Sequence, residues 1–255
     1  MQRLAPYLMQ RQAPYPMQRI AIVLTVICCL STVARAQTTE LSWEARITLD
    51  ANSINSTGLR TASGVASDAL IPLSIGVPVT LYALGALEVF DSSPDNRYMA
   101  ETGLQTAVTM GVTYALSLGI KTLVDRQRPY QQYPGTIVNY RNDHDASFPS
   151  GHSAGSAALA TSLSLRYPHW YVIAPSVAYA LFTGFSRLNL GMHYLSDVLA
   201  GYALGVGVAL LTNALNDKLF DAANGILPKN SSIGVLPADL LNRDITPLFS
   251  FSIAL

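Results

Sequence analysis

Three short segments of the chain concentrate the side chains that could do chemistry. The first is Lys-Thr-Leu-Val-Asp-Arg-Gln-Arg-Pro at 121–129, the second is Pro-Ser-Gly-His at 149–152, and the third is Ser-Arg-Leu-Asn-Leu-Gly-Met-His-Tyr-Leu-Ser-Asp at 186–197. Lysine and arginine hold phosphate oxygens through charge-assisted hydrogen bonds, and a histidine can attack phosphorus or supply a proton. Together the segments contain the parts needed to bind and cleave a phosphate ester.

The basic residues predict an anion site only in combination. Lys121 and Arg128 are seven residues apart, two helical turns, so we expect them on one face of a helix that Pro129 ends. Arg187 adds a third positive charge, and an arginine fork matches two phosphate oxygens at once. Alone, Lys121 or Arg128 is more typical of a helix C-terminus, where cations interact favourably with the helix dipole.

The second segment predicts an anion-binding turn at the start of a helix near Ser153. Backbone N–H groups are free at such a start, and Gly151 allows a ligand to approach them closely. Ser150 can add its hydroxyl group, and His152 stands where it could protonate a leaving oxygen.

The third segment predicts a histidine oriented by a carboxylate. His193 and Asp197 are four residues apart and would share a helix face, so the carboxylate can hold one imidazole nitrogen while the other attacks. The residues between Arg187 and His193 can turn at Gly191. An isolated His-x-x-x-Asp pair is usually an ordinary helix contact.

Other candidates for chemistry are weaker. Asp143, His144 and Asp145 resemble a metal-ligand cluster, but their position favours a solvated loop rim. We therefore predict no metal site. The two cysteines, Cys28 and Cys29, lie in an N-terminal apolar run, so we expect no cysteine chemistry in the mature protein.

The elements that must position these segments are five stretches without a formal charge. They span residues 69–87, 102–120, 153–165, 167–186 and 198–216, and most are long enough for a membrane span. They are rich in small residues, and Gly201 and Gly205 form the G-x-x-x-G pattern that lets helices approach closely. We expect an all-α bundle of about five to six apolar helices, embedded in a membrane. The alternative is the buried core of a soluble helical domain.

The ends of the chain have other characters. Arg19 precedes an apolar run at 20–30 and an Ala-Arg-Ala sequence at 34–36, which is the layout of a secretory signal. We predict a signal peptide at 1–36, a polar arm at 37–68 with a turn at 52–58, a helical domain at 69–216 and a tail at 217–255. Alternation at 249–253 in the tail predicts a short extended strand. An uncleaved anchor is the alternative to the signal.

The net charge and the expected membrane topology limit the class of protein further. The formal net charge is zero and there is no basic stripe, which argues against a nucleic-acid partner. If the five stretches are spans, all three chemical segments meet on the outer side of the membrane.

In order and internal spacing, the segments resemble the signature of the type 2 phosphatidic acid phosphatase superfamily, which is K-x6-R-P, P-S-G-H and S-R-x5-H-x3-D. The resemblance covers about residues 69–216. It implies phosphate binding and a phosphohistidine intermediate, with no metal or other cofactor. The phosphate-binding residues would be Lys121, Arg128, Ser150, Gly151 and Arg187, the nucleophile His193, its orienting partner Asp197 and the general acid His152.

The resemblance leaves three classes open. The first is a phosphatase of the bacterial inner membrane, with its site facing the periplasm, that hydrolyses a lipid phosphate monoester or a polyprenyl diphosphate. The second is a soluble periplasmic acid phosphatase of broad specificity. The third is a vanadium-dependent haloperoxidase, which would bind vanadate through His193. The expected partners are a phosphorylated lipid and the membrane, while the sequence names no protein partner.

Overall fold

The computed structural model describes residues 41–89, 94–141, 143 and 145–227, which form helices joined by short loops. The helices are α2 (Trp43–Asn52), α3 (Thr57–Ala86), α4 (Pro94–Val124), α5 (Pro129–Gln132), α6 (Gly151–Arg166), α7 (Trp170–Asn189), α8 (Leu195–Ala214) and α9 (Asn216–Ala222). The described residues contain no strand, so the all-α prediction is confirmed. The predicted signal at 1–36 and strand at 249–253 lie outside the described residues.

The five long helices overlap the five charge-free stretches, and α3 and α4 begin well before theirs. α3 begins at Thr57, well before the apolar stretch, because Ser56 caps it by accepting a hydrogen bond from Leu59 N at 3.2 Å. The chain turns at residues 53–56, within the predicted turn at 52–58. The segment predicted as a polar arm therefore contains α2 and the first turns of α3.

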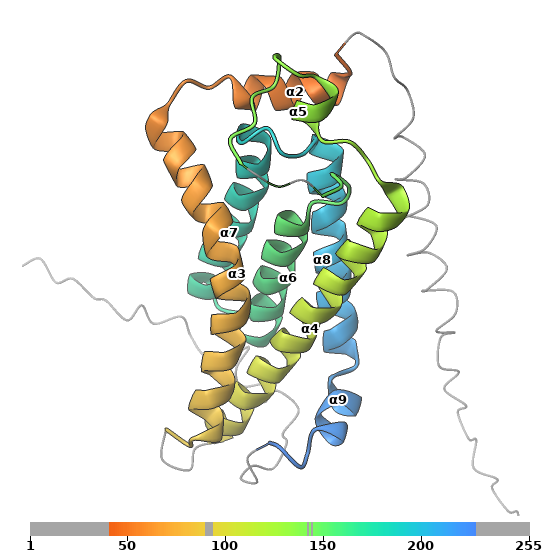
Figure 1. Ribbon diagram of the computed structural model, residues 1–255. Helices are drawn as coiled ribbons and strands as arrows, with labels where there is room; N and C mark the ends of the chain where they lie inside the picture. Colours follow the sequence, from red (N-terminus) through yellow and green to blue (C-terminus); the bar gives the residue numbers. More distant parts are fainter. Residues whose placement is uncertain (1–40, 90–93, 142, 144, 228–255) are drawn as a thin grey trace, which may run out of the picture.

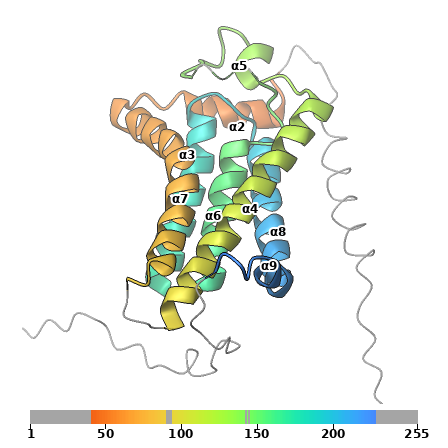
Figure 2. The same ribbon diagram turned by 60° about the horizontal axis from the view of Figure 1, so that its bottom comes forward.

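α6 occupies the centre of the bundle, surrounded by α3, α4, α7 and α8 (Figures 1 and 2). Its small buried residues allow α8 to pack against it closely. A Cβ atom at Gly201 would lie 2.5 Å from Ser150 O, and one at Gly205 would overlap Ala154 O. Only glycine fits at such backbone contacts, so the G-x-x-x-G prediction is confirmed.

The outer surface of the bundle is that of a membrane protein. Three helical segments are long and apolar enough to cross a bilayer: Thr57–Ala86, Asp95–Gln132 and Leu195–Ala214. On the first of these, Val65 and Ile75 are each 62% exposed, and apolar surface of this kind needs lipid or a partner to cover it. Most of the five charge-free stretches have the length of a span, but the third is shorter, and α6, which contains it, is a 16-residue helix enclosed by its neighbours.

One end of the bundle gathers all three chemical segments. The end of α4, the start of α6, the end of α7 and the start of α8 lie there, and α2 crosses above them (Figure 1). α2 is tied to the loops beneath it. The Asn52 side chain donates to Val138 O (3.1 Å) and Asn189 O (2.9 Å), and Thr48 Oγ1 donates to His193 O (3.3 Å). α2 therefore fixes the segment that carries His193.

Candidate active site

The predicted phosphate binders and the third-segment histidine converge in the interior. Arg128, Arg187 and His193 are each no more than 2% exposed, although each carries a polar or charged side chain. Arg128 Nη1 lies 3.2 Å from His193 Nε2 and donates to Met192 O at 3.0 Å. We call Lys121, Arg128 and Arg187 the cationic cluster. Such a buried concentration of positive charge favours an anionic ligand.

The geometry of the first segment differs from the prediction. α4 ends at Val124, and Asp125 has a positive φ of 44°, which turns the chain away from the helix axis. Lys121 and Arg128 therefore do not share a helix face; Arg128 lies at the N-cap of α5 instead. The two side chains still converge, because both bind the carboxylate of Asp145.

The second segment forms the helix start that the sequence predicts. Ser150 is the N-cap of α6, and its Oγ accepts from Ser153 N (3.3 Å) and Ser153 Oγ (2.9 Å). Its hydroxyl is thus already used for capping. Gly151 and His152 are the first two residues of the helix, where backbone N–H groups have no partner within the helix.

The third segment also corrects the prediction. α8 begins at Leu195, so His193 lies in the preceding loop rather than on the same helix face as Asp197. His193 Nδ1 is 3.6 Å from Asp197 Oδ2, which is too long for a hydrogen bond. Ser147 stands beside both: its Oγ donates to Asp197 Oδ2 at 2.5 Å and lies 3.4 Å from His193 Nδ1. The predicted turn is confirmed, since Gly191 has φ of +74°.

A second charged group, absent from the sequence prediction, holds Asp197. Arg126 Nη1 donates to Asp197 Oδ1 at 2.6 Å, its Nη2 pairs with Glu44 of α2, and its guanidinium lies over the Tyr194 ring at 4.0 Å. Ser196 accepts from Arg126 and donates to Glu44. Arg126 was detectable as an additional arginine inside the first segment. No sequence pattern indicated a role for Glu44, because it lies far from the three chemical segments in the chain.

Two acidic residues occupy the cationic cluster. Asp145 Oδ2 lies 3.1 Å from Lys121 Nζ and its other oxygen pairs with Arg128, while Asp143 accepts from Arg187 Nη2 at 2.7 Å. The side chains of Asp145 and Asp143 are 54% and 41% exposed, which agrees with the predicted position on a solvated loop rim. Their ion pairs with the cationic cluster were not predicted from the sequence. Arg187 Nε is buried and has no hydrogen-bond partner among the described residues. The cluster therefore already binds carboxylates and retains a free donor.

Electrostatics at the site follow from burial and these charges. Partial burial raises the pKa of Asp145, but Lys121 and Arg128 outweigh it and bring the value to about 2. Burial, together with Arg128 and Arg187, lowers the pKa of His193 well below its usual range. Burial and Arg187 also lower the pKa of His152, against the opposing effect of Asp143, to about 3. Without a bound anion, both imidazoles are neutral near pH 7.

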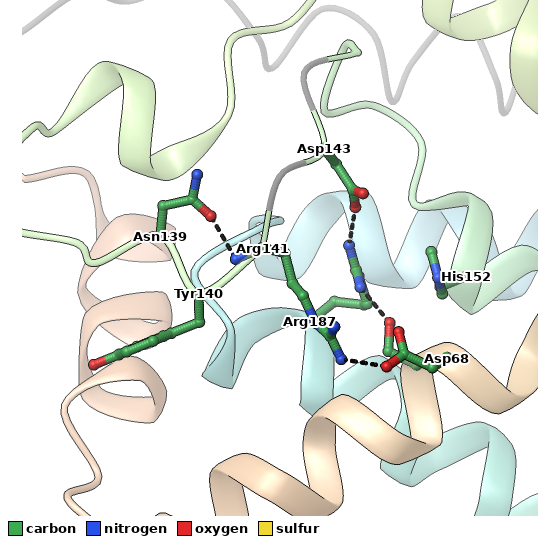
Figure 3. Close-up of a pocket in the computed structure, with 8 residues that line it drawn as sticks. Asp68, Asn139, Tyr140, Arg141, Asp143, His152 and Arg187 are labelled. Carbon is green, nitrogen blue, oxygen red and sulfur yellow. Dashed lines mark hydrogen bonds and ion pairs between the residues drawn. The ribbon is translucent and has the colours of Figure 1, made fainter.

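A cavity of about 540 Å³ opens beside the cluster (Figure 3). Its lining is polar and comes from α3, α6, α7 and the loop before α6. The lining residues are Ser67, Asp68, Asn139, Tyr140, Arg141, Asp143, His152 and Arg187. Figure 3 shows Asp143 paired with Arg187, and Asp68 with Arg141. His152 belongs to this lining, whereas His193, beside Arg128, does not.

Fold and site together define a helical membrane protein with a buried cationic site flanked by two histidines. Residues 102–221 match the model of the PAP2 superfamily. The resemblance seen in the three segments is thereby confirmed.

Several relatives are phosphatases. The chain is 38% identical over 106 residues to decaprenylphosphoryl-5-phosphoribose phosphatase from Mycobacterium tuberculosis, covering 41% of this chain and 55% of that protein. It is 32% identical over 119 residues to lipid A 1-phosphatase from Rhizobium johnstonii (45% and 48% covered). It is 29% identical over 154 residues to undecaprenyl-diphosphatase from Bacillus subtilis (57% and 76% covered). The chain thus spans about half the length of the first two.

Solved structures support the fold. The transmembrane PAP2-type phosphatidylglycerolphosphate phosphatase from Bacillus subtilis superposes with a TM-score of 0.59 at 21% identity, covering 78% of this chain and 96% of that one. LpxE from Aquifex aeolicus superposes with a TM-score of 0.52 at 21% identity, covering 66% and 93%. At this identity the likeness concerns the fold alone.

Proposed function

We propose that this protein is a membrane phosphatase that hydrolyses a lipid phosphate monoester or a polyprenyl diphosphate through a phosphohistidine. The main support is the cationic cluster beside two neutral histidines at one end of an apolar bundle. Outward-facing apolar side chains such as Ile75 favour this function over a soluble acid phosphatase. The names of the phosphatase relatives support the same class.

In the first step, His193 Nε2 attacks phosphorus. Nε2 is the nitrogen beside Arg128, so a phosphate oxygen held by that guanidinium lies next to the nucleophile. The other nitrogen, Nδ1, faces Ser147 and Asp197, which orient the ring and stabilise its positive charge as the N–P bond forms. The bond between phosphorus and the leaving oxygen breaks, and His152 donates its proton to that oxygen.

The substrate itself supplies the condition for acid catalysis. His152 is neutral in the unliganded site because burial and the positive charge of Arg187 disfavour its protonation. A phosphate dianion cancels that charge and favours the imidazolium form. Binding of the phosphate dianion therefore raises the pKa of the general acid, His152.

In the second step, a water molecule attacks the phosphohistidine and gives its proton to His152. The P–N bond breaks, inorganic phosphate leaves, and His193 is neutral again. The net reaction is ester plus water to alcohol plus phosphate. Lys121, Arg128 and Arg187 hold the equatorial oxygens in both steps, after displacement of the loop carboxylates that occupy them.

We further propose that the site faces the periplasm of a bacterial inner membrane. The secretory-signal pattern ends at residue 36, and α2 begins at Trp43. α2 lies at the same end of the bundle as the site (Figure 1). Export of the segment after the signal, or an uncleaved anchor that starts inside, would place this end outside.

The test measures phosphate release by detergent-purified protein with phosphatidate, undecaprenyl diphosphate and a water-soluble phosphate ester. We expect hydrolysis of at least one lipid substrate, complete loss in His193→Ala and retention in the control His169→Ala. Protein quenched at high pH during turnover should carry phosphate on the peptide containing His193, as detected by mass spectrometry. Substantial turnover by a folded His193→Ala variant would exclude the proposed nucleophile.

A further inference from the structure

The cavity is lined by His152, the proposed proton donor to the leaving group. This inference rests on the proposed function. In an in-line displacement the nucleophile and the leaving group are on opposite sides of phosphorus. His152, the proposed proton donor to the leaving oxygen, lines the cavity, whereas His193 does not. The side chains of the cavity wall therefore indicate which chemical class of leaving group carries the phosphate.

The far wall of the cavity is made of hydrogen-bonding side chains outside the three chemical segments. Arg141 Nη2 lies 2.9 Å from Asp68 Oδ2, and Arg141 N donates to Asn139 Oδ1 at 2.8 Å (Figure 3). Arg141 lies against α3, where a Cβ atom at Gly64 would be 2.7 Å from its Nη2. Asp68 and Arg141 keep 67% and 29% of their side-chain surface exposed, so both have donors or acceptors available to a ligand.

Charge in the cavity is balanced. Each carboxylate has its own arginine, Asp68 with Arg141 and Asp143 with Arg187. A second phosphate group would find no surplus positive charge on the far wall once Arg187 holds the reacting phosphate. A purely apolar alcohol would leave the wall's polar groups facing hydrocarbon, which costs free energy. A neutral group with several hydroxyls can donate to Asp68 and accept from Arg141.

We propose that the cavity binds a hydroxyl-bearing leaving group, a sugar or a glycerol unit, and that Arg141 and Asp68 determine this specificity. The volume of about 540 Å³ is within the range typical of small-molecule sites. The cavity thus selects phosphate esters of a polyol head group rather than esters of a plain alcohol.

The test uses four lipids with tails of equal length: an acylglycerol phosphate, a glycolipid with a sugar phosphate, a plain alkyl phosphate and a plain alkyl diphosphate. Wild-type protein should hydrolyse the glycerol or sugar ester with kcat/KM about tenfold or more above that of the alkyl phosphate, because the wall's polar groups go unpaired with the latter. Arg141→Met keeps the aliphatic stem and should bring that ratio to within about twofold of unity. Asp68→Asn should lower the same ratio, and the exposed control Arg46→Met should keep it.

Three outcomes are decisive. Equal wild-type kcat/KM for the alkyl and polyol esters, or a preference for the diphosphate, would overturn this inference while leaving the proposed function intact. Arg141→Met and Asp68→Asn variants that fold and keep the wild-type ratio would overturn it as well. A wild-type protein that hydrolyses none of the four lipids would refute the proposed function and this inference together. Because the Arg141–Asp68 pair is exposed, we expect both variants to fold.

Discussion

Arg126 is the residue whose loss should reveal most about the site. It joins the loop after α4 to the partner of the proposed nucleophile and to α2, through Asp197 and Glu44. The Asp197 and Glu44 side chains are 0% and 7% exposed, so neither carboxylate can be solvated in its place. Arg126→Met keeps an unbranched aliphatic side chain but leaves two buried carboxylates without their shared cation.

The expected cost follows from this burial. Removal of one partner from a buried ion pair costs about 3–5 kcal/mol, and each kcal/mol lowers the Tm of a chain of this size by about 2–4 °C. We therefore predict a fall in Tm of about 6–20 °C. Because Arg126 is outside the cationic cluster, kcat should fall more than KM rises, as Asp197 loses its fixed position beside His193.

Thermal unfolding in detergent, followed by circular dichroism, measures the fall in Tm. Phosphate release, assayed at a temperature at which wild type and variant are both folded, measures kcat and KM. Glu44→Gln provides the control, because in that background Arg126→Met uncovers one carboxylate instead of two and should cost less. A single Arg126→Met variant that unfolds within about 2 °C of the wild type would refute the argument from buried charge.

Three further predictions concern the same end of the bundle. Asp145→Asn removes the carboxylate that competes for the cationic cluster, so KM and the inhibition constant for vanadate should fall about three- to tenfold; unchanged constants would mean that the loop does not compete. Gly191→Ala should lower the free energy of unfolding by about 1–3 kcal/mol, since φ is +74° and a Cβ atom would overlap Val138 O; an unaltered denaturation midpoint would count against this strain. The pKa of His193 is lower in the folded protein than in the unfolded chain, where it is about 6.5. Above that pH the imidazole is neutral in both states, and the stability of the fold is complete with respect to this group. As the pH falls from there towards the folded-state pKa, only the unfolded chain takes up the proton, so stability is lost. The Tm of the wild type should therefore fall more between pH 7.5 and 5 than that of His193→Gln, and equal falls would contradict the assignment.

Much of the fold could be predicted because helices in lipid have a strong local signature. The five charge-free stretches overlap α3, α4, α6, α7 and α8, and Gly201 and Gly205 predicted the contact between α8 and α6. The extension of α3 to Thr57 was missed, because its first turns are polar and depend on a serine cap rather than on apolar periodicity.

Helix boundaries at the site could not be predicted from residue spacing. Lys121 and Arg128 are two helical turns apart in sequence, but Asp125 ends the helix between them with a positive φ. The spacing of His193 and Asp197 also suggested one helix face, although the helix begins only at Leu195. Both pairs converge nonetheless, because the loops rather than the helices bring them together.

The sequence by itself determined the chemical parts: the basic residues, the two histidines and the order of the three segments on apolar helices. Only the tertiary structure decided what surrounds them. It placed Glu44 and Arg126 behind Asp197, two loop carboxylates on the cationic cluster and a polar cavity beside His152. The physical reason is that ion pairs and cavities depend on contacts between residues far apart in the chain, and these leave no periodicity in the sequence.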